Sequence, residues 1–423
     1  MHRLLAVILA GGTGERLSIL SQERAKPAVP FAGKYRIIDF SLSNCVNSGV
    51  YNVIVLTQYQ PVSLTEHIGI GTSWGLVPPD RNVRLLQPYL AREEGRDWYK
   101  GTADAVHQNL DRIEAEDIDE VLILSGDHVY KMDYSEMLEF HRANEADVTL
   151  AVTRMPEDEL YRFGTVVTDE KGQITRFQEK VKNPQSNLVS MGVYLFNTGI
   201  LRQWLDIRTG HDFGRNIFPK MVDKGRMFAF SFDGYWRDIG TVDSLWQSNM
   251  EILAISQSFL NDIDWPLYTK EVEVPPTKVG DSASVTNCLL SSGCKIDGHI
   301  ERSIISPGVH VAEGAVVKDS IVMDNTVIGR NSVIDHSILD KEITVEADCH
   351  IGYGDDYRIN RTNPQVLSTG LSVVGKRTVI PAGYKIGRNC IIYDNVVEGD
   401  FPAPVVKSGE TVKPKRKPIR IKA

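Results

Sequence analysis

The residues best suited to chemistry form a glycine-rich turn near the start of the chain. Residues 4–10 are apolar and lead into Gly11-Gly12-Thr13-Gly14-Glu15-Arg16-Leu17, which places three glycines within four positions. Such a turn lets the backbone approach a ligand closely and can offer its N–H groups to phosphate oxygens. It lacks the third glycine of the dinucleotide-binding pattern and no Gly-Lys-Ser/Thr follows it, so neither a dinucleotide site nor a P-loop is predicted. An ordinary strand-to-helix turn is the alternative.

An acidic residue follows a second apolar run. Residues 121–125 read as a buried strand that ends in Gly126-Asp127. Open α/β sheets bind ligands at the carboxyl ends of their strands, so Asp127 is placed to hold a cation. Aspartates at strand ends can also cap helices, and that alternative stays open.

The elements that position these residues alternate between strand and helix. Two prolines predict extended backbone over residues 24–30. Alternation of this kind predicts an α/β domain, with a Rossmann-like, mostly parallel sheet and flanking helices, over residues 1–256. We expect helices at 37–48, 62–68, 101–113 and 242–255, and further strands at 53–57, 83–86, 148–152, 164–168, 174–177, 191–196 and 228–232.

A repeat of six residues begins after a proline-containing linker at 257–278. Hexapeptide repeats wind a parallel β-helix in which one apolar residue in six points inward. We predict such a β-helix for residues 279–423, interrupted by a loop at 353–369 and ending in a basic tail at 413–422. Eight consecutive apolar positions at this spacing are predicted to point inward: Val309, Ala315, Ile321, Val327, Val333, Leu339, Val345 and Ile351.

Composition narrows the class of protein. The 423 residues carry a net charge of −8 without charged blocks before the tail, which gives no indication of nucleic-acid binding. No apolar run reaches the length of about 18 residues needed for a membrane span, and the apolar N-terminal run opens into the glycine turn instead of a cleavage site. The five cysteines form no C-x-x-C pair and are odd in number, which favours buried thiols in a reducing cytosol.

Seven phrases in a fixed order carry a resemblance to a known family. Together with the glycine turn, they resemble the bacterial ADP-glucose pyrophosphorylases, or glucose-1-phosphate adenylyltransferases, among the sugar-1-phosphate nucleotidyltransferases. The phrases are Arg24-Ala25-Lys26-Pro27-Ala28-Val29, Arg36-Ile37-Ile38-Asp39-Phe40, Leu42-Ser43-Asn44-Cys45, Trp98-Tyr99-Lys100-Gly101-Thr102-Ala103-Asp104-Ala105, Gly126-Asp127-His128-Val129-Tyr130, His211-Asp212-Phe213-Gly214 and Tyr235-Trp236-Arg237-Asp238-Ile239-Gly240-Thr241.

The resemblance implies an activity and its setting. It implies that ATP and glucose 1-phosphate react to ADP-glucose and diphosphate in the cytoplasm, with Mg²⁺ as cofactor, to supply glycogen synthesis. It also implies a left-handed β-helix, a homotetramer and allosteric control by anionic metabolites. Neither a nucleic acid nor a membrane is an expected partner.

The resemblance also implies roles for individual residues. Catalysis of phosphate chemistry of this kind rests on positioning and charge neutralisation, and Mg²⁺ takes few carboxylates and leaves its other positions to phosphate and water. The implied catalytic residues are Arg16, Lys26, Asp127 and Asp238, of which Asp127 and Asp238 would hold the metal. The implied nucleotide-binding residues are Leu9, Ala10, Gly11, Gly12, Gln87 and Gly101. For glucose 1-phosphate they are Tyr99, Gly164, Glu179, Lys180 and Ser190, and for an effector they are Arg24 and Arg36.

The chain departs from the family pattern at one position, and there are alternatives to the implied function. Enteric members activated by fructose 1,6-bisphosphate have lysine where this chain has Glu23, which puts that activator in doubt. The alternatives are a nucleotidyltransferase for GTP, UTP or dTTP, and a noncatalytic regulatory subunit. A second, acyltransferase activity of the β-helix would draw on a histidine, and the candidates by residue type are His299, His310, His336 and His350.

Overall fold

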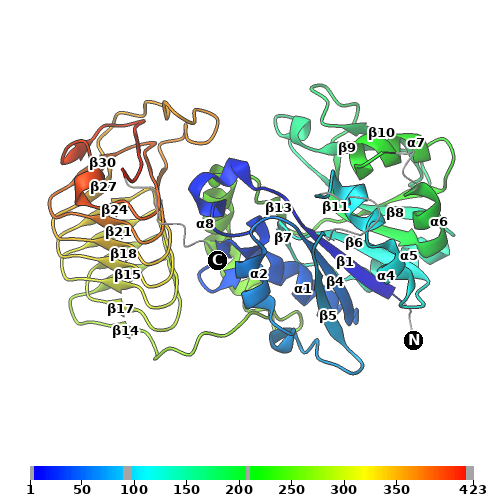
Figure 1. Ribbon diagram of the computed structural model, residues 1–423, viewed down its shortest axis with the longest axis horizontal. Helices are drawn as coiled ribbons and strands as arrows, with labels where there is room; N and C mark the ends of the chain where they lie inside the picture. The colour runs from blue at the N-terminus through cyan, green and yellow to red at the C-terminus, as the bar shows by residue number, and fades with distance from the viewer. Residues whose placement is uncertain (1–3, 89–97, 206–209, 416–423) are drawn as a thin grey trace. The chain divides into compact units, whose positions relative to one another are not determined.

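The computed structural model describes residues 4–88, 98–205 and 210–415 (Figure 1). The chain divides into two compact units, each assembled from separate parts of the sequence. The first unit comprises Met1–Thr13, Ile37–Asp238 and Asp264–Tyr268, and the second comprises Gly14–Arg36, Ile239–Ile263 and Thr269–Ala423. The predicted boundaries at residues 256 and 278 describe a linear division and stay a prediction, as does the basic tail, most of which lies outside the described residues.

The first unit is built on one mixed sheet, to which nine strands belong in the described ranges. Its main path runs in the order β10-β9-β11-β6-β1-β4-β5, while β8 pairs with β11 and β12 pairs with β8. The strands are β1 (Leu4–Ala10), β4 (Asn52–Thr57), β5 (Asn82–Leu86), β6 (Glu120–Ser125), β8 (Val148–Arg154), β9 (Gly164–Thr168), β10 (Ile174–Glu179), β11 (Leu188–Asn197) and β12 (Met227–Ser231).

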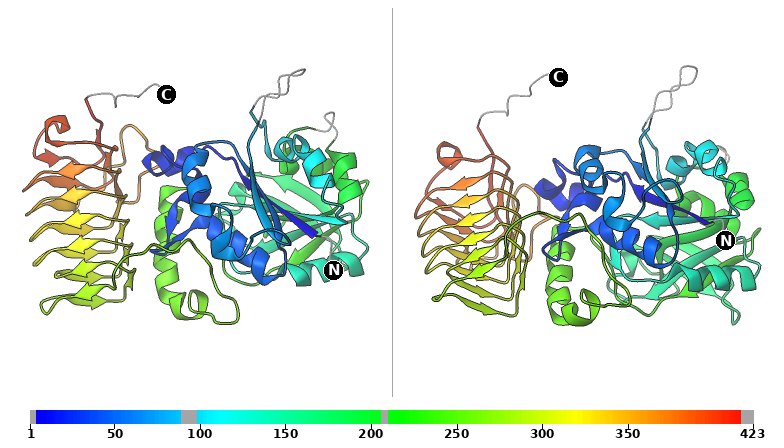
Figure 2. Two further views of the ribbon diagram at one scale, coloured as in Figure 1. Left: turned by 60° about the horizontal axis from the view of Figure 1, so that its bottom comes forward. Right: turned by 90° about the horizontal axis from the view of Figure 1, so that it is seen from below.

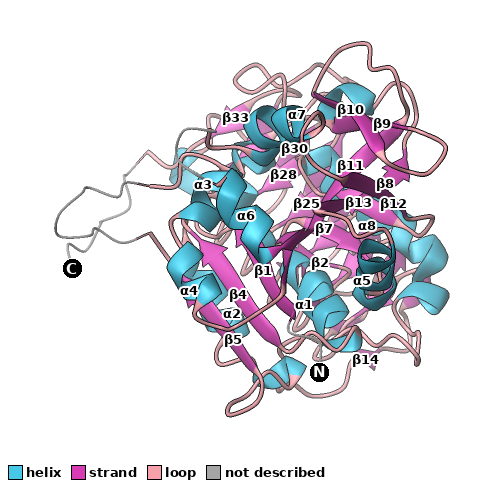
Figure 3. Cartoon of the chain, turned by 90° about the vertical axis from the view of Figure 1, so that its right-hand side faces the viewer, coloured by secondary structure: helices cyan, strands magenta, loops and turns pink. Residues whose placement is uncertain are grey.

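Helices cover this sheet, as its apolar strands predict. In β1, Leu5 and Val7 join a core cluster with Val106, while their neighbours Ala6 and Ile8 are also fully buried. Figure 3 separates the cyan helices of the unit from its magenta strands. The helices are α1 (Ile37–Asn47), α2 (Pro61–Ile68), α3 (Thr102–His107), α4 (Leu110–Glu114), α5 (Tyr134–Ala143), α6 (Thr198–Trp204) and α7 (Phe218–Met221), with shorter helical turns η3 (Thr72–Trp74), η4 (Leu160–Arg162) and η5 (Phe213–Ile217).

The central strands run parallel and end at one edge of the sheet. Strand β1 pairs in parallel with β4 and β6, so that Ala10 lies opposite Thr57 and Leu9 lies opposite Ser125. The turns after these three strands therefore meet, and one of them is the glycine turn. A two-stranded antiparallel sheet of β7 (His128–Tyr130) and β13 (Trp236–Asp238) adds to the same region. The predicted α/β architecture is confirmed.

Two local expectations were wrong. The single helix expected at residues 101–113 is divided into α3 and α4, because Asn109 leaves the helical conformation (φ −112°, ψ 11°). Residues 24–30 were expected to be extended, but they contain a short 3-10 helix, η2 (Lys26–Ala28), with Ala25 and Val29 extended on either side. Proline is tolerated in a first helical turn, because an N–H at that position would have no hydrogen-bond partner within the helix. Pro27 therefore does not prevent this turn.

In the second unit, most of the chain winds into a left-handed parallel β-helix whose strands form three sheets in the described residues (Figure 2). The first sheet contains β14 (Lys278–Val279), β17 (Lys295–Ile296), β20 (His310–Val311), β23 (Val327–Ile328), β26 (Thr344–Val345) and β29 (Val379–Ile380). The second contains β15 (Ser284–Thr286), β18 (His299–Glu301), β21 (Val316–Lys318), β24 (Val333–Asp335), β27 (His350–Tyr353), β30 (Lys385–Gly387) and β32 (Val405–Val406). The third contains β16 (Leu289–Leu290), β19 (Ile304–Ile305), β22 (Ile321–Val322), β25 (Ser337–Leu339), β28 (Ser372–Val374), β31 (Ile391–Ile392) and β33 (Thr411–Val412).

The spacing of inward residues differs from a strict repeat of six. Strand pairing places Val311 opposite Ile328 and Ile304 opposite Ile321, so a coil in this region spans seventeen residues. Between Val311 and Val345, the corner that leads from the second sheet to the third is one residue short, and it holds a residue with positive φ, such as Asp319 or His336. Three of the eight predicted positions are therefore wrong, among them Ile321, whose neighbour Val322 points inward. Val327 is 39% exposed and Val333 is half-buried, whereas Ile328 and Ile334 fill the interior.

The third sheet is buried on its outer side as well. Ile304, Ile321 and Ile338 precede inward residues, yet each is at most 2% exposed. The covering segments belong to the same unit and carry η1 (Glu15–Ser21), η2, β2 (Pro30–Phe31), β3 (Tyr35–Arg36) and α8 (Val242–Phe259). On α8, the indole N–H of Trp246 donates to the carbonyl oxygen of Asp319 at 2.7 Å. A short helical turn, η6 (Glu398–Asp400), lies near the last coil.

Two further expectations concern the whole chain. All five cysteines lie in the described ranges and are free, and four of them are buried as predicted. Within the described residues, no helix combines the length and the apolar character that crossing a membrane requires.

Candidate active site

A cavity of about 280 Å³ opens at the carboxyl ends of β1 and β4 in the first unit. The glycine turn forms one wall through Gly11 and Gly12, and the end of β6 contributes Asp127. A Cβ atom at Gly11 would approach the Cβ of Gln58 to 3.3 Å, so a side chain there would narrow the cavity. The lining residues are Leu9, Gly11, Gly12, Leu56, Gln58, Tyr99, Gly101, Thr102, Ala105, Ser125, Asp127 and Asp212.

Gln58 holds the opposite wall of the cavity in place. Its side-chain oxygen accepts a hydrogen bond from the backbone N–H of Tyr99 at 2.6 Å, and its amide nitrogen lies 3.5 Å from the carbonyl oxygen of the same residue. The Tyr99 hydroxyl in turn accepts from the amide of Asn109 at 3.0 Å. Sequence reasoning missed Gln58, although a polar residue directly after an apolar strand was a usable signal.

Six of the predicted site residues line this cavity, whereas Ala10 and Gln87, two of the residues predicted for the nucleotide, do not. Gly101 is one of the six, and a side chain there would collide with the carbonyl oxygen of His211. Ala10 is buried at the end of β1, opposite Thr57. Gln87 is exposed just beyond β5 and is not among the residues that line the cavity.

Three of the residues predicted for glucose 1-phosphate lie on neighbouring strands, and Lys180 directly follows one of them. Glu179 at the end of β10 pairs with Gly164 of β9, and Ser190 lies on β11. A Cβ at Gly164 would come within 2.8 Å of a Glu179 carboxylate oxygen, and one at Gly214 would collide with it, so both glycines make room for this carboxylate. Lys180 extends its ammonium group to 3.6 Å from Glu179 and is half exposed.

The Glu179 carboxyl has unusual surroundings for an acid. Burial raises its pKa above the ordinary value; Lys180 opposes this rise and Asp212 adds to it. Asp212 itself caps η5 by accepting from the backbone N–H of Arg215 at 2.9 Å, and it accepts from the hydroxyl of Thr102 at 3.3 Å. A half-buried acid between two glycines can exchange hydrogen bonds with hydroxyl groups of a ligand.

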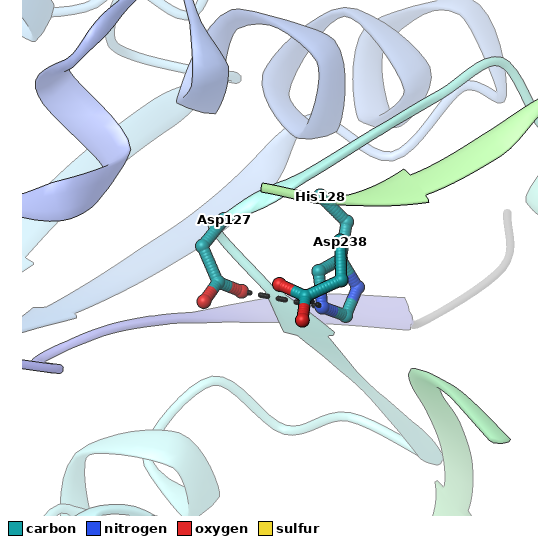
Figure 4. Close-up of side chains that lie close together, drawn as sticks. All are labelled: Asp127, His128 and Asp238. Carbon is teal, nitrogen blue, oxygen red and sulfur yellow. Dashed lines mark ion pairs between the residues drawn. The ribbon is translucent and has the colours of Figure 1, made fainter. Parts of the chain in front are cut away.

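Asp127, His128 and Asp238 form a compact group of metal-ligand atoms (Figure 4). Their nearest ligand atoms all lie within 4.8 Å of one another. Asp127 follows β6, and the antiparallel pairing of β7 with β13 places Asp238 opposite His128. Ser125 donates a hydrogen bond to Asp127, and Arg162 approaches Asp238 to 3.9 Å. Two carboxylates with a nitrogen donor are a ligand set that fits a divalent cation.

Comparisons with known proteins match two successive stretches of the chain. A family model described as nucleotidyl transferase matches residues 5–255, which is more than half of the chain. A second model, described as GlmU-like C-terminal hexapeptide, matches residues 274–374.

Relatives that match over nearly their full length identify the family within the nucleotidyl transferases. A glucose-1-phosphate adenylyltransferase of Thermomicrobium roseum is 51% identical over 423 residues, covering 98% of this chain and 98% of the relative. The chain belongs to the glucose-1-phosphate adenylyltransferase family. Relatives of the same name from Acetivibrio thermocellus and Thermotoga maritima are 45% and 44% identical, each covering 97% of this chain and 98% and 99% of themselves. The resemblance seen in the sequence is confirmed.

In this member of the glucose-1-phosphate adenylyltransferase family, the remaining predicted residues belong to the second unit. Arg16 is exposed on η1, and Lys26 is buried in η2. Gly14 precedes η1 with a φ of 67°, a conformation that favours glycine. The predicted roles of Arg16 and Lys26 toward a nucleotide stay predictions.

Arg24 and Arg36, the predicted effector residues, contact acidic residues of the β-helix within the second unit. Arg24 is 2% exposed, and one of its nitrogens donates to both carboxylate oxygens of Asp340 at 2.5 and 2.7 Å. Arg36 lies 3.5 Å from Asp324, which also pairs with Lys341. Burial, with Arg36 contributing, lowers the pKa of Lys341 to about 8.

Glu23 pairs with two further cations of this region. Arg377 donates to both of its carboxylate oxygens at 2.8 and 2.9 Å, and Lys376 lies at 3.5 Å. Burial alone would raise the pKa of Glu23, but the hydrogen bonds and charge of Arg377, with Lys376, bring it below its ordinary value. We call the cations Arg24, Arg36, Lys341, Lys376 and Arg377 the basic cluster.

Proposed function

We propose that this protein transfers the adenylyl group of ATP to glucose 1-phosphate, which yields ADP-glucose and diphosphate. Family membership over the full length supports the reaction. The observation that carries the proposal is the pairing of β7 with β13, since it gathers Asp127 and Asp238 at the sheet edge where the glycine turn lines a cavity. This is where an α/β sheet binds a nucleotide.

The proposed reaction is a displacement at the α-phosphorus of ATP. A phosphate oxygen of glucose 1-phosphate forms the new bond to this phosphorus, while the bond to the oxygen that bridges to the β-phosphorus breaks and diphosphate leaves. No proton has to be removed from an ionised phosphate, so the chain needs to align the two phosphates and to balance their charge.

The chain's own residues divide this work between two ligands. We expect the backbone of Gly11 and Gly12 to border the nucleotide, with Gln58 holding Tyr99 against it. We expect Lys180 to pair with the sugar phosphate and Glu179 to hydrogen-bond the sugar hydroxyls. Asp127 and Asp238 would hold Mg²⁺, which supplies positive charge to the phosphate oxygens when bound.

Several finer features are part of the proposal. We propose that the product supplies glycogen synthesis in the cytoplasm and that the active form is a homotetramer. Anionic metabolites would regulate it through the basic cluster, which includes Arg24 and Arg36. Glu23, which pairs with Arg377 of this cluster, stands where enteric relatives activated by fructose 1,6-bisphosphate have lysine, which argues against that compound as the effector.

The test is a measurement of diphosphate release from ATP, GTP, UTP and dTTP, each with glucose 1-phosphate. We expect ATP to be used with a kcat/KM at least about a hundredfold higher than that for any other nucleotide. A preference for another nucleotide would overturn the proposal in favour of a different sugar-1-phosphate nucleotidyltransferase. Absence of release from all four, with a panel of metabolites present, would favour a noncatalytic regulatory subunit.

A further inference from the structure

We infer that Asn109 is a positioning residue of the proposed reaction, because its side-chain amide holds the ring of Tyr99 as a fixed wall of the cavity that takes the nucleotide. This inference deepens the proposed function and rests on ATP as the ligand of that cavity. It arises from the contacts of Asn109 at the break between α3 and α4 in the first unit.

An asparagine directly before a helix usually caps that helix. Its side-chain oxygen then accepts a hydrogen bond from a backbone N–H of the first helical turn. Asn109 occupies this position before α4, yet within the described part of the chain its side chain makes no such bond. Asn109 is 3% exposed, and a buried carboxamide is rarely left without hydrogen bonds. Helix capping therefore does not account for this side chain.

The contacts of the Asn109 amide fix its orientation. Its Nδ2 atom donates to the carbonyl oxygen of Ala105 at 2.8 Å. A carbonyl oxygen only accepts hydrogen bonds, so this contact distinguishes the nitrogen of the carboxamide from its oxygen. The same nitrogen donates to the hydroxyl oxygen of Tyr99 at 3.0 Å. The bond between Asn109 and Tyr99 therefore has a defined donor and a defined acceptor.

Tyr99 is consequently held at both of its ends. Its backbone N–H donates to the side-chain oxygen of Gln58 at 2.6 Å, and Asn109 holds its hydroxyl. A tyrosine ring moves about two side-chain torsions, and a hydrogen bond at the hydroxyl restricts both. A Cβ atom at Gly11 would lie 4.0 Å from Cδ2 of the ring, so the ring stands beside the glycine turn. Gly11, Tyr99 and Ala105 all line the cavity.

A wall that is fixed before the nucleotide arrives favours binding. A side chain that is already ordered loses little conformational freedom when a ligand packs against it, which raises the affinity. Without the hydrogen bond from Asn109, the Tyr99 ring gains freedom that ATP binding must remove. The resemblance assigns Tyr99 to glucose 1-phosphate instead, so the two substrates are measured separately.

Isothermal titration calorimetry of ATP with Mg²⁺ into the full chain, without glucose 1-phosphate, tests the inference apart from catalysis. Tyr99→Phe keeps the ring and removes the hydroxyl, and Asn109→Leu keeps the volume and removes the amide. We expect each variant to bind ATP about fivefold more weakly, since one neutral hydrogen bond is lost. An unchanged affinity in either variant would overturn the inference.

The double variant shows whether Asn109 acts through Tyr99. We expect it to bind ATP about fivefold more weakly than the wild type, as each single variant does, because both substitutions remove the same hydrogen bond. Independent effects would multiply to about twenty-fivefold, and that result would overturn the inference.

Asn144→Leu is the matched control. The Asn144 amide also donates to the carbonyl oxygen four residues earlier, that of Phe140, at 2.8 Å, but it follows α5, and Asn144 is not among the residues that line the cavity. We expect its ATP affinity to equal that of the wild type. In steady-state assays, Tyr99→Phe and Asn109→Leu should raise the KM for ATP about fivefold and change the KM for glucose 1-phosphate by less than about twofold. A rise in the KM for glucose 1-phosphate that equals or exceeds the rise for ATP would overturn the inference.

The different failures are distinguishable. If the wild type binds ATP and the variants bind it equally well, the inference falls and the proposed function stands. If the wild type binds another nucleoside triphosphate but not ATP, the proposed function falls and the inference falls with it. Circular dichroism verifies that the variants fold. If Asn109→Leu does not fold, Asn109→Ala, which adds no bulk, takes its place in the double variant.

Discussion

At the scale of single residues, the acids of the first unit lie in two different surroundings. Asp127 and Asp238 face each other across a small group that also contains an imidazole nitrogen. Glu179 lies between two glycines, and burial raises its pKa. The first surroundings suit a cation and the second suit uncharged hydroxyl groups. The two sets of acids can therefore serve the two substrates separately.

The aspartate pair leads to the first prediction. Asp127→Asn and Asp238→Asn keep the shape of each side chain but remove its charge, so we expect kcat to fall by about a thousandfold or more. Asp233→Asn is the matched control, because Asp233 is an exposed aspartate of the same segment. Steady-state diphosphate release and a thermal unfolding curve for each variant give the result. Near-normal activity in either site variant would remove that aspartate from the catalytic group.

Lys180 leads to a second prediction. Its ammonium group is half exposed and lies beside Glu179, where it can pair with a ligand phosphate. We expect Lys180→Ala to raise the KM for glucose 1-phosphate by about a hundredfold while the KM for ATP changes little, because a charged hydrogen bond is lost on one substrate only. Lys182→Ala, a nearby exposed lysine, should leave both values unchanged. Equal effects on both KM values would argue against this role.

At this scale, the sequence predicted the location of Asp127 at the end of an apolar strand. It did not predict the orientation of the His128 side chain. Asp127 could be predicted because a strand end fixes its location. Gln58 carried the same signal but no motif drew attention to it. The orientation of His128 could not be predicted, because it depends on the carbonyl of Met191 and on Gly192 from a strand that is distant in sequence.

At the scale of elements, the coils of the β-helix explain why the repeat was only partly predicted. Between Val311 and Val345, a six-residue period is correct at two corners of each coil and fails at the third, which is one residue shorter. Polar residues with positive φ also stand at the longer corners, such as Asn325 and Asn331, so this feature does not mark the short corner in the sequence. The six-residue period therefore places Ile321, Val327 and Val333 in the interior, which their neighbours Val322, Ile328 and Ile334 in fact occupy.

The pairing of Glu23 with the basic cluster leads to a third prediction. Glu23→Ala removes the counter-charge of Arg377 and Lys376, so we expect anionic metabolites to bind this region about fivefold more tightly. The measurement is the rate of diphosphate release as a function of the concentration of each phosphorylated metabolite in a panel. Glu15→Ala is the control, because Glu15 is exposed on η1. An unchanged response would show that this pair does not limit effector binding.

Asp394, close to the same region, leads to a fourth prediction. Burial, with the charge of Asp340 adding to it, raises the pKa of Asp394 from 3.8 to about 6. Between these values the folded protein holds a proton that the unfolded chain releases, so the contribution of Asp394 to stability falls as pH rises through this range and stays low above it.

The variant Asp394→Asn removes this dependence. Its side-chain oxygen can still accept from the backbone N–H of Lys376, which Asp394 contacts at 2.8 Å. At about pH 8 we expect the variant to have a free energy of unfolding higher than that of the wild type by up to about 3 kcal/mol, with little difference near pH 4. Denaturant unfolding at the two pH values measures this. A variant that is less stable than the wild type at both pH values would contradict the free-energy cost assigned to the ionised Asp394 carboxylate.

At the scale of the whole molecule, each compact unit is assembled from stretches that are not contiguous in the sequence. Residues 14–36 and 239–263 belong with the β-helix, although they border the α/β sheet in the sequence. The reason is the buried outer side of the third sheet, where doublets such as Ile304-Ile305 and Ile321-Val322 are apolar on both faces. Adjacent apolar residues in a short strand indicate burial on both sides, but they do not identify the covering segment. The fold class could thus be predicted, and the composition of each unit could not.

The central claim is that the bond formed joins the α-phosphorus of ATP to glucose 1-phosphate. The most direct test is to follow [α-³²P]ATP and [γ-³²P]ATP separately in reactions of the full chain with glucose 1-phosphate and Mg²⁺. The account predicts that the α label appears in ADP-glucose and the γ label in diphosphate, in equal amounts. The appearance of the γ label in a sugar phosphate or in inorganic phosphate, with no α label in a nucleotide sugar, would contradict it.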